Sequence, residues 1–206
     1  MVNLRIIANA DDCAIADWLE TRLAAALASS TGEVAITVPG GVTPFPILAE
    51  LVRRSLDWSR IGVWPGDERM VPKGHPASNA GRIREALGPV GARIVPLSQD
   101  ACPPHFALAW LGMGEDGHIA SLFPSSDPQV DEPMPLCRLT PDPLPPEAPF
   151  ERLSLTIPAL LDSAELLFVI RGEAKRALFA AAAAGINDLP IARLLRAARQ
   201  PITCFT

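Results

Sequence analysis

The sequence predicts an α/β fold with a mostly parallel β-sheet, for three reasons. Short apolar, β-branched runs alternate along the chain with segments of helical periodicity, which is the pattern of strand–helix–strand units. The chain has 206 residues, enough for one domain with a sizeable core. It contains no internal repeat and no Gly/Ser-rich linker, so residues 1–206 are expected to form a single domain.

The first elements have clear boundaries. Asp11 or Asp12 can cap a first helix, which we expect to end before Gly32. Residues 34–38 form a predicted buried strand, and Pro44 stands where the first turn of a helix accepts proline. The apolar face of that second helix would consist of Ile47, Leu48, Leu51 and Val52.

The rest of the chain continues this alternation. Ser78 can cap a helix that runs to Leu87. Strands are expected at 61–64, 93–95, 106–111, 152–156 and 166–170, helices from 158 and over 173–184, an edge strand at 201–205, and a Pro-rich surface connection at 141–149.

Four of the predicted strands end in a polar or glycine-rich segment. These segments span residues 40–43, 66–69, 112–118 and 171–175. In an open parallel sheet, the ligand crevice lies beyond the carboxyl ends of the strands. We therefore expect the four segments to meet in one site.

The overall charge limits the choice of ligand. A net charge of -5 and a pI near 5.2 argue against a nucleic-acid partner, which usually needs a basic face. An anionic small molecule would need positive groups gathered locally. The four cysteines have no Cys-x-x-Cys spacing, and neither a signal peptide nor a membrane-spanning stretch is recognisable, so we expect reduced thiols and a cytoplasmic protein.

Two of these polar or glycine-rich segments fit more than one function. In Gly40-Gly41-Val42-Thr43, paired glycines and the N-terminus of a helix favour an anion, yet a plain tight turn also fits, and no Lys-Ser/Thr follows to make a P-loop. In the second segment, Arg69 suits phosphate capture and Asp67 suits sugar hydroxyls, although a solvated salt-bridge cluster fits equally well.

The third segment carries the candidate catalytic residues. Its Gly-x-Gly-x-x-Gly spacing matches the dinucleotide-binding pattern, but Pro124 arrives too early for the long helix which that motif must open. A glycine-lined loop presenting Asp116 and His118 better fits general-base chemistry, with the imidazole taking the proton and the carboxylate orienting it. Lys175 fits either a solvated lysine or a ligand contact. The three histidines have no metal-ligand spacing, so no metal site is expected.

Together these segments resemble the 6-phosphogluconolactonase family. The resemblance covers nearly the whole chain. It implies a Rossmann-like three-layer α/β sandwich without metal or cofactor that hydrolyses 6-phospho-D-glucono-1,5-lactone to 6-phosphogluconate in the oxidative pentose phosphate pathway. It is carried by the motifs Gly40–Pro44, Trp64–Arg69 with Ser78-Asn79, Leu111–Pro124, Arg152–Thr156 and Gly172–Lys175.

The resemblance also implies a role for each candidate residue. His118 would be the catalytic histidine with Asp116 beside it, and Asp67 would lie close to the sugar. The groups that hold the phosphate would be Gly40, Gly41, Thr43, Arg69 and Lys175.

Two features depart from the family pattern. Pro39 and Val42 stand where serine is usual, which removes hydroxyl donors from the phosphate loop. The segment between Leu97 and Phe106 is too short for a helix common in relatives, so the strand at 106 would have a less covered flank, favouring a homo-oligomer or a partner.

Two other functions remain open. One is an aldose–ketose isomerase or amino-sugar-phosphate deaminase on the same fold, against which Arg69 and the segment Ser121–Pro124 argue. The other is a non-catalytic sugar-phosphate sensor, against which the intact Asp116 and His118 argue.

Overall fold

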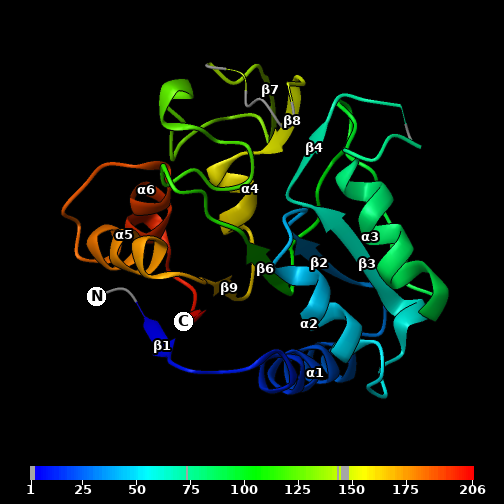
Figure 1. Ribbon diagram of the computed structural model, residues 1–206. Helices are drawn as coiled ribbons and strands as arrows, with labels where there is room; N and C mark the ends of the chain where they lie inside the picture. The colour runs from blue at the N-terminus through cyan, green and yellow to red at the C-terminus, as the bar shows by residue number, and fades with distance from the viewer. Residues whose placement is uncertain (1–2, 73, 143, 145–148) are drawn as a thin grey trace.

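A seven-stranded sheet runs through the middle of the protein (Figure 1), seen in a computed structural model that describes residues 3–72, 74–142, 144 and 149–206. Every neighbouring pair of its strands is parallel, which confirms the predicted α/β class. In spatial order the strands are β1 (Leu4–Ile7), β10 (Ile202–Phe205), β9 (Leu166–Val169), β6 (Leu108–Leu111), β2 (Val34–Val38), β3 (Ile61–Pro65) and β5 (Arg93–Ile94).

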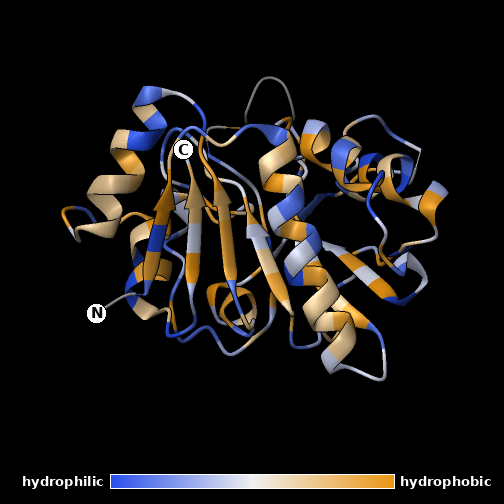
Figure 2. Ribbon diagram, turned by 90° about the horizontal axis from the view of Figure 1, so that it is seen from below, coloured by the Kyte–Doolittle hydropathy of each residue, from blue (hydrophilic) through white to orange (hydrophobic). Residues whose placement is uncertain are grey.

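Helices cover both faces of this sheet, so the protein has the expected three layers. Along the central strand β6, Leu108 and Trp110 belong to one buried cluster and Ala109 and Leu111 to the other, because successive side chains of a strand point to opposite faces. The apolar colour of the sheet strands between their covering helices reflects this double burial (Figure 2). One cluster includes side chains of α1 (Asp12–Ser29), α2 (Pro44–Leu51) and α3 (Asn79–Leu87), and the other of α4 (Ile157–Leu161), α5 (Glu173–Ala183) and α6 (Pro190–Ala197).

A second, antiparallel sheet stands at the carboxyl edge of the first. It consists of β4 (Asp67–Arg69), β8 (Arg152–Leu155) and β7 (Leu136–Leu139), in that order. Strand β4 begins just after β3 ends, with only Gly66 between them. The small sheet is therefore placed where ligand-binding segments were expected.

The predicted helix starts are confirmed by their caps. The Asp11 side chain accepts a hydrogen bond from the Ala14 amide at 2.8 Å, and the Ser78 hydroxyl accepts one from the Gly81 amide at 3.0 Å. None of the helices in the described part of the chain is both long and apolar enough to cross a bilayer.

The sequence suggested that the C-terminal strand lies at the edge of the sheet, but it does not. Strand β10 pairs with β9 on one side and with β1 on the other, and β1 was not predicted. Strand β1 has only four residues and none of them is buried, so it lacks the buried apolar run that marks the inner strands of this sheet. Strands β4 and β7 and helix α6 were also missed, and the Pro-rich connection at 141–149 lies largely outside the described residues.

The flank of β6 is covered, contrary to expectation. Phe106 and Ala109 are fully buried, and Leu97 and Ala101 of the short preceding segment pack against the same cluster in place of a helix. The argument for an oligomer from an uncovered flank therefore fails, and the oligomeric state stays a prediction.

Candidate active site

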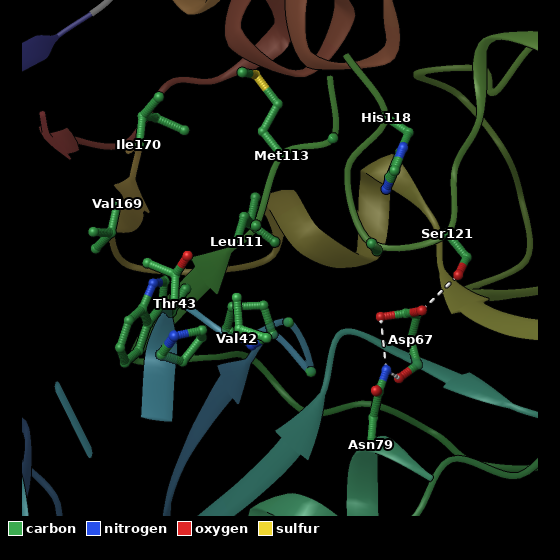
Figure 3. A pocket seen from close by; sticks show the side chains of 18 of the residues that line it. Val42, Thr43, Asp67, Asn79, Leu111, Met113, His118, Ser121, Val169 and Ile170 are labelled. Carbon is green, nitrogen blue, oxygen red and sulfur yellow. Dashed lines mark hydrogen bonds between the residues drawn. The ribbon is translucent and has the colours of Figure 1, made fainter. Parts of the chain in front are cut away.

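The four polar or glycine-rich segments follow four neighbouring strands of the large sheet, in the order β9, β6, β2 and β3. Their residues line one cavity of about 460 Å³ (Figure 3), which confirms that they meet. Of the predicted site residues, only Asp116 does not line it, and Asp116 contacts His118, which does. The others are Gly40, Gly41, Thr43, Asp67, Arg69 and Lys175.

His118 and Asp116 form a pair at the rim of this cavity. The Asp116 Oδ1 lies 2.6 Å from the His118 Nδ1 and also accepts a bond from the His118 backbone amide at 3.2 Å. Partial burial acts to raise the pKa of Asp116, but the hydrogen bonds and charge of His118 outweigh burial and lower it. An ionised Asp116 must accept the proton on Nδ1, so in the neutral imidazole Nε2 is the basic nitrogen.

Gly114 makes room for this pair. A β-carbon at position 114 would lie 2.1 Å from the His118 ring and 2.7 Å from the Asp116 carboxylate. The Gly114 amide also donates to the His118 carbonyl at 2.9 Å, which closes the loop around the pair. On its other side, the His118 ring packs against Phe123 with ring centroids 4.6 Å apart. The loop opens no α-helix, so the dinucleotide-binding pattern is rejected here as well.

The loop after β2 lines the cavity and has backbone amides free to donate. The first turn of α2 lacks two N–H groups because it contains Pro44 and Pro46, so any anion would meet the amides of residues 41–43 instead. No oxygen of the described residues accepts a hydrogen bond from these three amides. Thr43 precedes the helix without capping it by its side chain, which leaves its hydroxyl available. Pro39 and Val42 line the cavity without hydroxyl groups, as expected from their identities.

Gly40 is held by packing. A β-carbon at this position would lie 1.9 Å from the Asn79 Oδ1, so any side chain there would displace Asn79. Its carbonyl accepts a hydrogen bond from the Arg82 Nη1 at 2.7 Å. The first glycine of the pair therefore fixes the loop against α3, while Gly41 faces open space.

Asp67 forms a rigid polar wall of the cavity. Its Oδ2 accepts from the Ser121 hydroxyl at 2.5 Å and its Oδ1 from the Asn79 Nδ2 at 3.1 Å, with the side chains arranged as in Figure 3. Asp67 is buried at 8 % exposure. Glu68, by contrast, accepts from the amides of Asn79 and Ala80 and so caps α3, which makes it a structural residue.

The other polar side chains of the cavity are mostly cationic. Arg171 is tied to the start of α1 by bonds to the Ala10 carbonyl at 3.0 Å and the Asp12 carboxylate at 3.2 Å. Among the described lining residues, Asp67 is the only carboxylate, whereas four are cations, Arg69, Arg152, Arg171 and Lys175. A protein of net charge -5 thus gathers positive charge at this one site.

Nearly the whole chain matches one family. Residues 10–102 and 92–203 match the family model described as "Glucosamine-6-phosphate isomerases/6-phosphogluconolactonase". The chain belongs to this family. It is 36% identical to the 6-phosphogluconolactonase of Pseudomonas putida over 84% of this chain and 80% of the relative, and 34% identical to that of Rhizobium meliloti over 93% and 92%. The structure of 6-phosphogluconolactonase from Thermotoga maritima has the same fold, with a TM-score of 0.82, 24% identity and 98% of each chain covered.

Three lining residues of this family member were not given a role from sequence. Asn79 and Ser121 hold Asp67, although both lie in motifs that carry the family resemblance. Arg152 was assigned only to a strand, but it is 3% exposed and lines the cavity. An arginine at the start of a predicted strand was the available signal, but the sequence does not show which strand pairs with it. No group of three His, Cys, Asp or Glu side chains suited to a metal ion occurs among residues that the structure describes.

Proposed function

We propose that this chain hydrolyses 6-phospho-D-glucono-1,5-lactone to 6-phosphogluconate, as a lactonase of the pentose phosphate pathway. The observation that carries the proposal is the His118–Asp116 pair beside a cavity with four cations and one carboxylate. The names and 34–36% identities of the Pseudomonas putida and Rhizobium meliloti relatives support this substrate.

His118 is the general base in this proposal. Nε2 takes a proton from water while the water oxygen bonds to C1 of the lactone, and the carbonyl π electrons move onto the carbonyl oxygen. As the tetrahedral intermediate collapses, the bond from C1 to the ring oxygen breaks and its electrons stay on that oxygen. The imidazolium then returns its proton there, and the new carboxylic acid loses its proton to solvent.

In this proposal, the phosphate of the lactone binds at the loop after β2. The amides of residues 41–43, which have no acceptor among the described residues, and the Thr43 hydroxyl can donate to phosphate oxygens. Lys175 supplies a positive charge. Asp67 is the proposed acceptor for a sugar hydroxyl, because each of its oxygens can accept a second hydrogen bond.

The test is a hydrolysis assay on phosphorylated and unphosphorylated gluconolactone, with spontaneous opening subtracted from a blank. The His118→Asn variant should lose about 10²–10⁴-fold in kcat, the usual share of a positioned base. His105→Asn is a matched control, because His105 forms a similar pair with Asp162 at 2.7 Å but does not line the cavity. Unchanged turnover in His118→Asn would show that another group is the base.

The same protein should be assayed for the alternatives. The family model includes glucosamine-6-phosphate isomerases, so ammonia release from glucosamine 6-phosphate is the competing activity. A wild-type chain that releases ammonia and leaves the lactone rate at the blank would replace the lactonase with a deaminase. A chain that binds sugar phosphates and turns over neither compound would be a sensor.

A further inference from the structure

Two arginines lie opposite each other on adjacent strands of the small antiparallel sheet. Arg69 of β4 and Arg152 of β8 are direct partners in the strand register, and both line the cavity. Like charges directly opposite each other destabilise a sheet. Such a pair is best explained by an anion that binds between or beside the two guanidinium groups.

Burial makes this arginine pair more destabilising to the fold. Arg152 is 3% exposed, and burial, followed by the charge of Arg69, lowers its pKa. The Nη1 of Arg69 donates to the Ala77 carbonyl at 2.9 Å, whereas its Nε is buried with no partner among the described residues. A buried donor of this kind costs stability unless a ligand accepts from it.

Two carboxylates lie close enough to the arginine pair to act on its charge. Asp67 accepts from Ser121 and Asn79, and Glu68 accepts from the backbone at the start of α3. Both contribute a favourable field at Arg152. Their hydrogen bonds to α3 and to the His118 loop hold these parts of the site together.

Arg69 and Lys175 come from segments that follow well-separated strands of the large sheet. Asp67, which shares a face of β4 with Arg69, is seen with Ser121 and His118 on one side of Figure 3, and Thr43, Val169 and Ile170 are on the opposite side. Lys175 follows Ile170 along the chain. Strand β3, which leads to Arg69, is separated from β9, which leads to Lys175, by β6 and β2, a distance of roughly 14 Å at normal strand spacing. The loop with Thr43 follows β2, the strand next to β3.

The product of the proposed reaction has an anion at each end, a carboxylate at C1 and a phosphate at C6. We propose that the Arg69–Arg152 pair binds the C1 end, holding the lactone carbonyl oxygen as it becomes the oxyanion and then the product carboxylate. The inference rests on the proposed function, and it moves Arg69 from the phosphate to the reacting end. Guanidinium groups suit this task because they donate paired hydrogen bonds to two carboxylate oxygens.

Two ligands that differ only at C1 test this assignment. In 6-phosphogluconate C1 is a carboxylate, and in glucitol 6-phosphate it is a hydroxymethyl group, with the same phosphate. Dissociation constants are measured by calorimetry for wild type, Arg69→Gln and Arg152→Gln, after circular dichroism has confirmed the fold. Each variant should bind 6-phosphogluconate about tenfold or more weakly than wild type and glucitol 6-phosphate nearly as well as wild type.

Lys175→Gln tests the phosphate end, because it should weaken the binding of both ligands equally. Arg84→Gln is the control, since Arg84 is an exposed arginine of α3 that does not line this cavity. If Arg152→Gln fails to fold, Arg69→Gln decides alone, because Arg69 is less buried.

If Arg69→Gln weakened the binding of both ligands equally, the phosphate would lie at the arginine pair and the inference would be overturned. Unchanged binding of both ligands would overturn it too. Because these are binding measurements, weaker binding of 6-phosphogluconate alone would support the inference even if the lactone were not hydrolysed. Failure of the proposed function would then be seen in the hydrolysis assay only.

Discussion

The carboxylate of Asp116 decides which nitrogen of His118 can act as a base. At 2.6 Å from Nδ1, and with its pKa lowered by the histidine despite partial burial, Asp116 stays ionised well below neutral pH. The imidazole therefore keeps its proton on Nδ1 and accepts a second one on Nε2. The same contact that orients the ring would stabilise the imidazolium formed during turnover.

A pH profile tests this arrangement. Only the neutral form of an imidazole is a base, so kcat/KM should fall toward acidic pH as His118 becomes protonated. The pKa of Asp116 is lowered, so this carboxylate stays ionised in mildly acidic solution and does not cause the fall. In Asp116→Asn the acid limb should move to lower pH, because the imidazolium loses its partner, and kcat should fall less than in His118→Asn. An acid limb that does not move would show that Asp116 has no electrostatic effect on the base.

A glycine gives a steric test of the same pair. Gly114→Ala would put a β-carbon 2.1 Å from the His118 ring, so the ring must shift and kcat should fall by about tenfold or more while the phosphate contacts persist. Gly32→Ala is the matched control, because a β-carbon there meets nothing within 4 Å. Comparable activity in the two variants would mean that the position of the ring is not critical.

At the scale of single elements, the first turn of α3 connects the small sheet to the active site. The Glu68 carboxylate accepts from the Asn79 and Ala80 amides at 2.7 and 2.8 Å and from the Ser78 hydroxyl at 3.0 Å. Asn79 in turn donates to Asp67. One carboxylate next to the site thus stabilises the helix terminus, and through it the position of Asp67.

Removing this cap should therefore cost stability. Glu68→Ala should lower the free energy of unfolding in urea by about 1–2 kcal/mol, because it leaves buried helix amides without an acceptor. Glu85→Ala, an exposed glutamate later in the same helix, should change it by less than about 0.5 kcal/mol. Equal effects of both substitutions would contradict a capping role for Glu68.

The elements differ in how far the sequence could predict them. Helices with a capping residue and strands with continuous apolar runs were predictable, because local signals define them. Strands β4 and β7 depend on pairing with β8, a tertiary interaction between segments far apart in the chain. For the same reason Arg152 could not be assigned to the site, since only the register of β8 against β4 brings it opposite Arg69.

At the scale of the whole molecule, the site was more predictable than the fold details. Four polar or glycine-rich segments at strand ends suffice to locate it, because a parallel sheet brings the carboxyl ends of its strands to one edge whatever the strand order. The strand order itself was not predictable, and it decides which segments are neighbours. It separates Lys175 from Arg69 across the cavity, although the family resemblance assigned both to one phosphate.

The contrast between the net charge and the cavity makes a last prediction. The chain carries -5 overall, which repels a phosphate dianion at long range, while four cations line the cavity. Once the ligand is bound, the near charges dominate, and salt weakens them, since the Debye length falls from about 10 Å at 0.1 M to about 3 Å at 1 M. KM for the phosphorylated lactone should therefore rise several-fold between about 0.1 and 1 M sodium chloride, with kcat nearly constant. Unphosphorylated gluconolactone provides the control, because it is neutral and its KM should hardly change. If both lactones respond to salt alike, the cations of the cavity do not select the phosphate, and the placement of the phosphate near Lys175 is wrong.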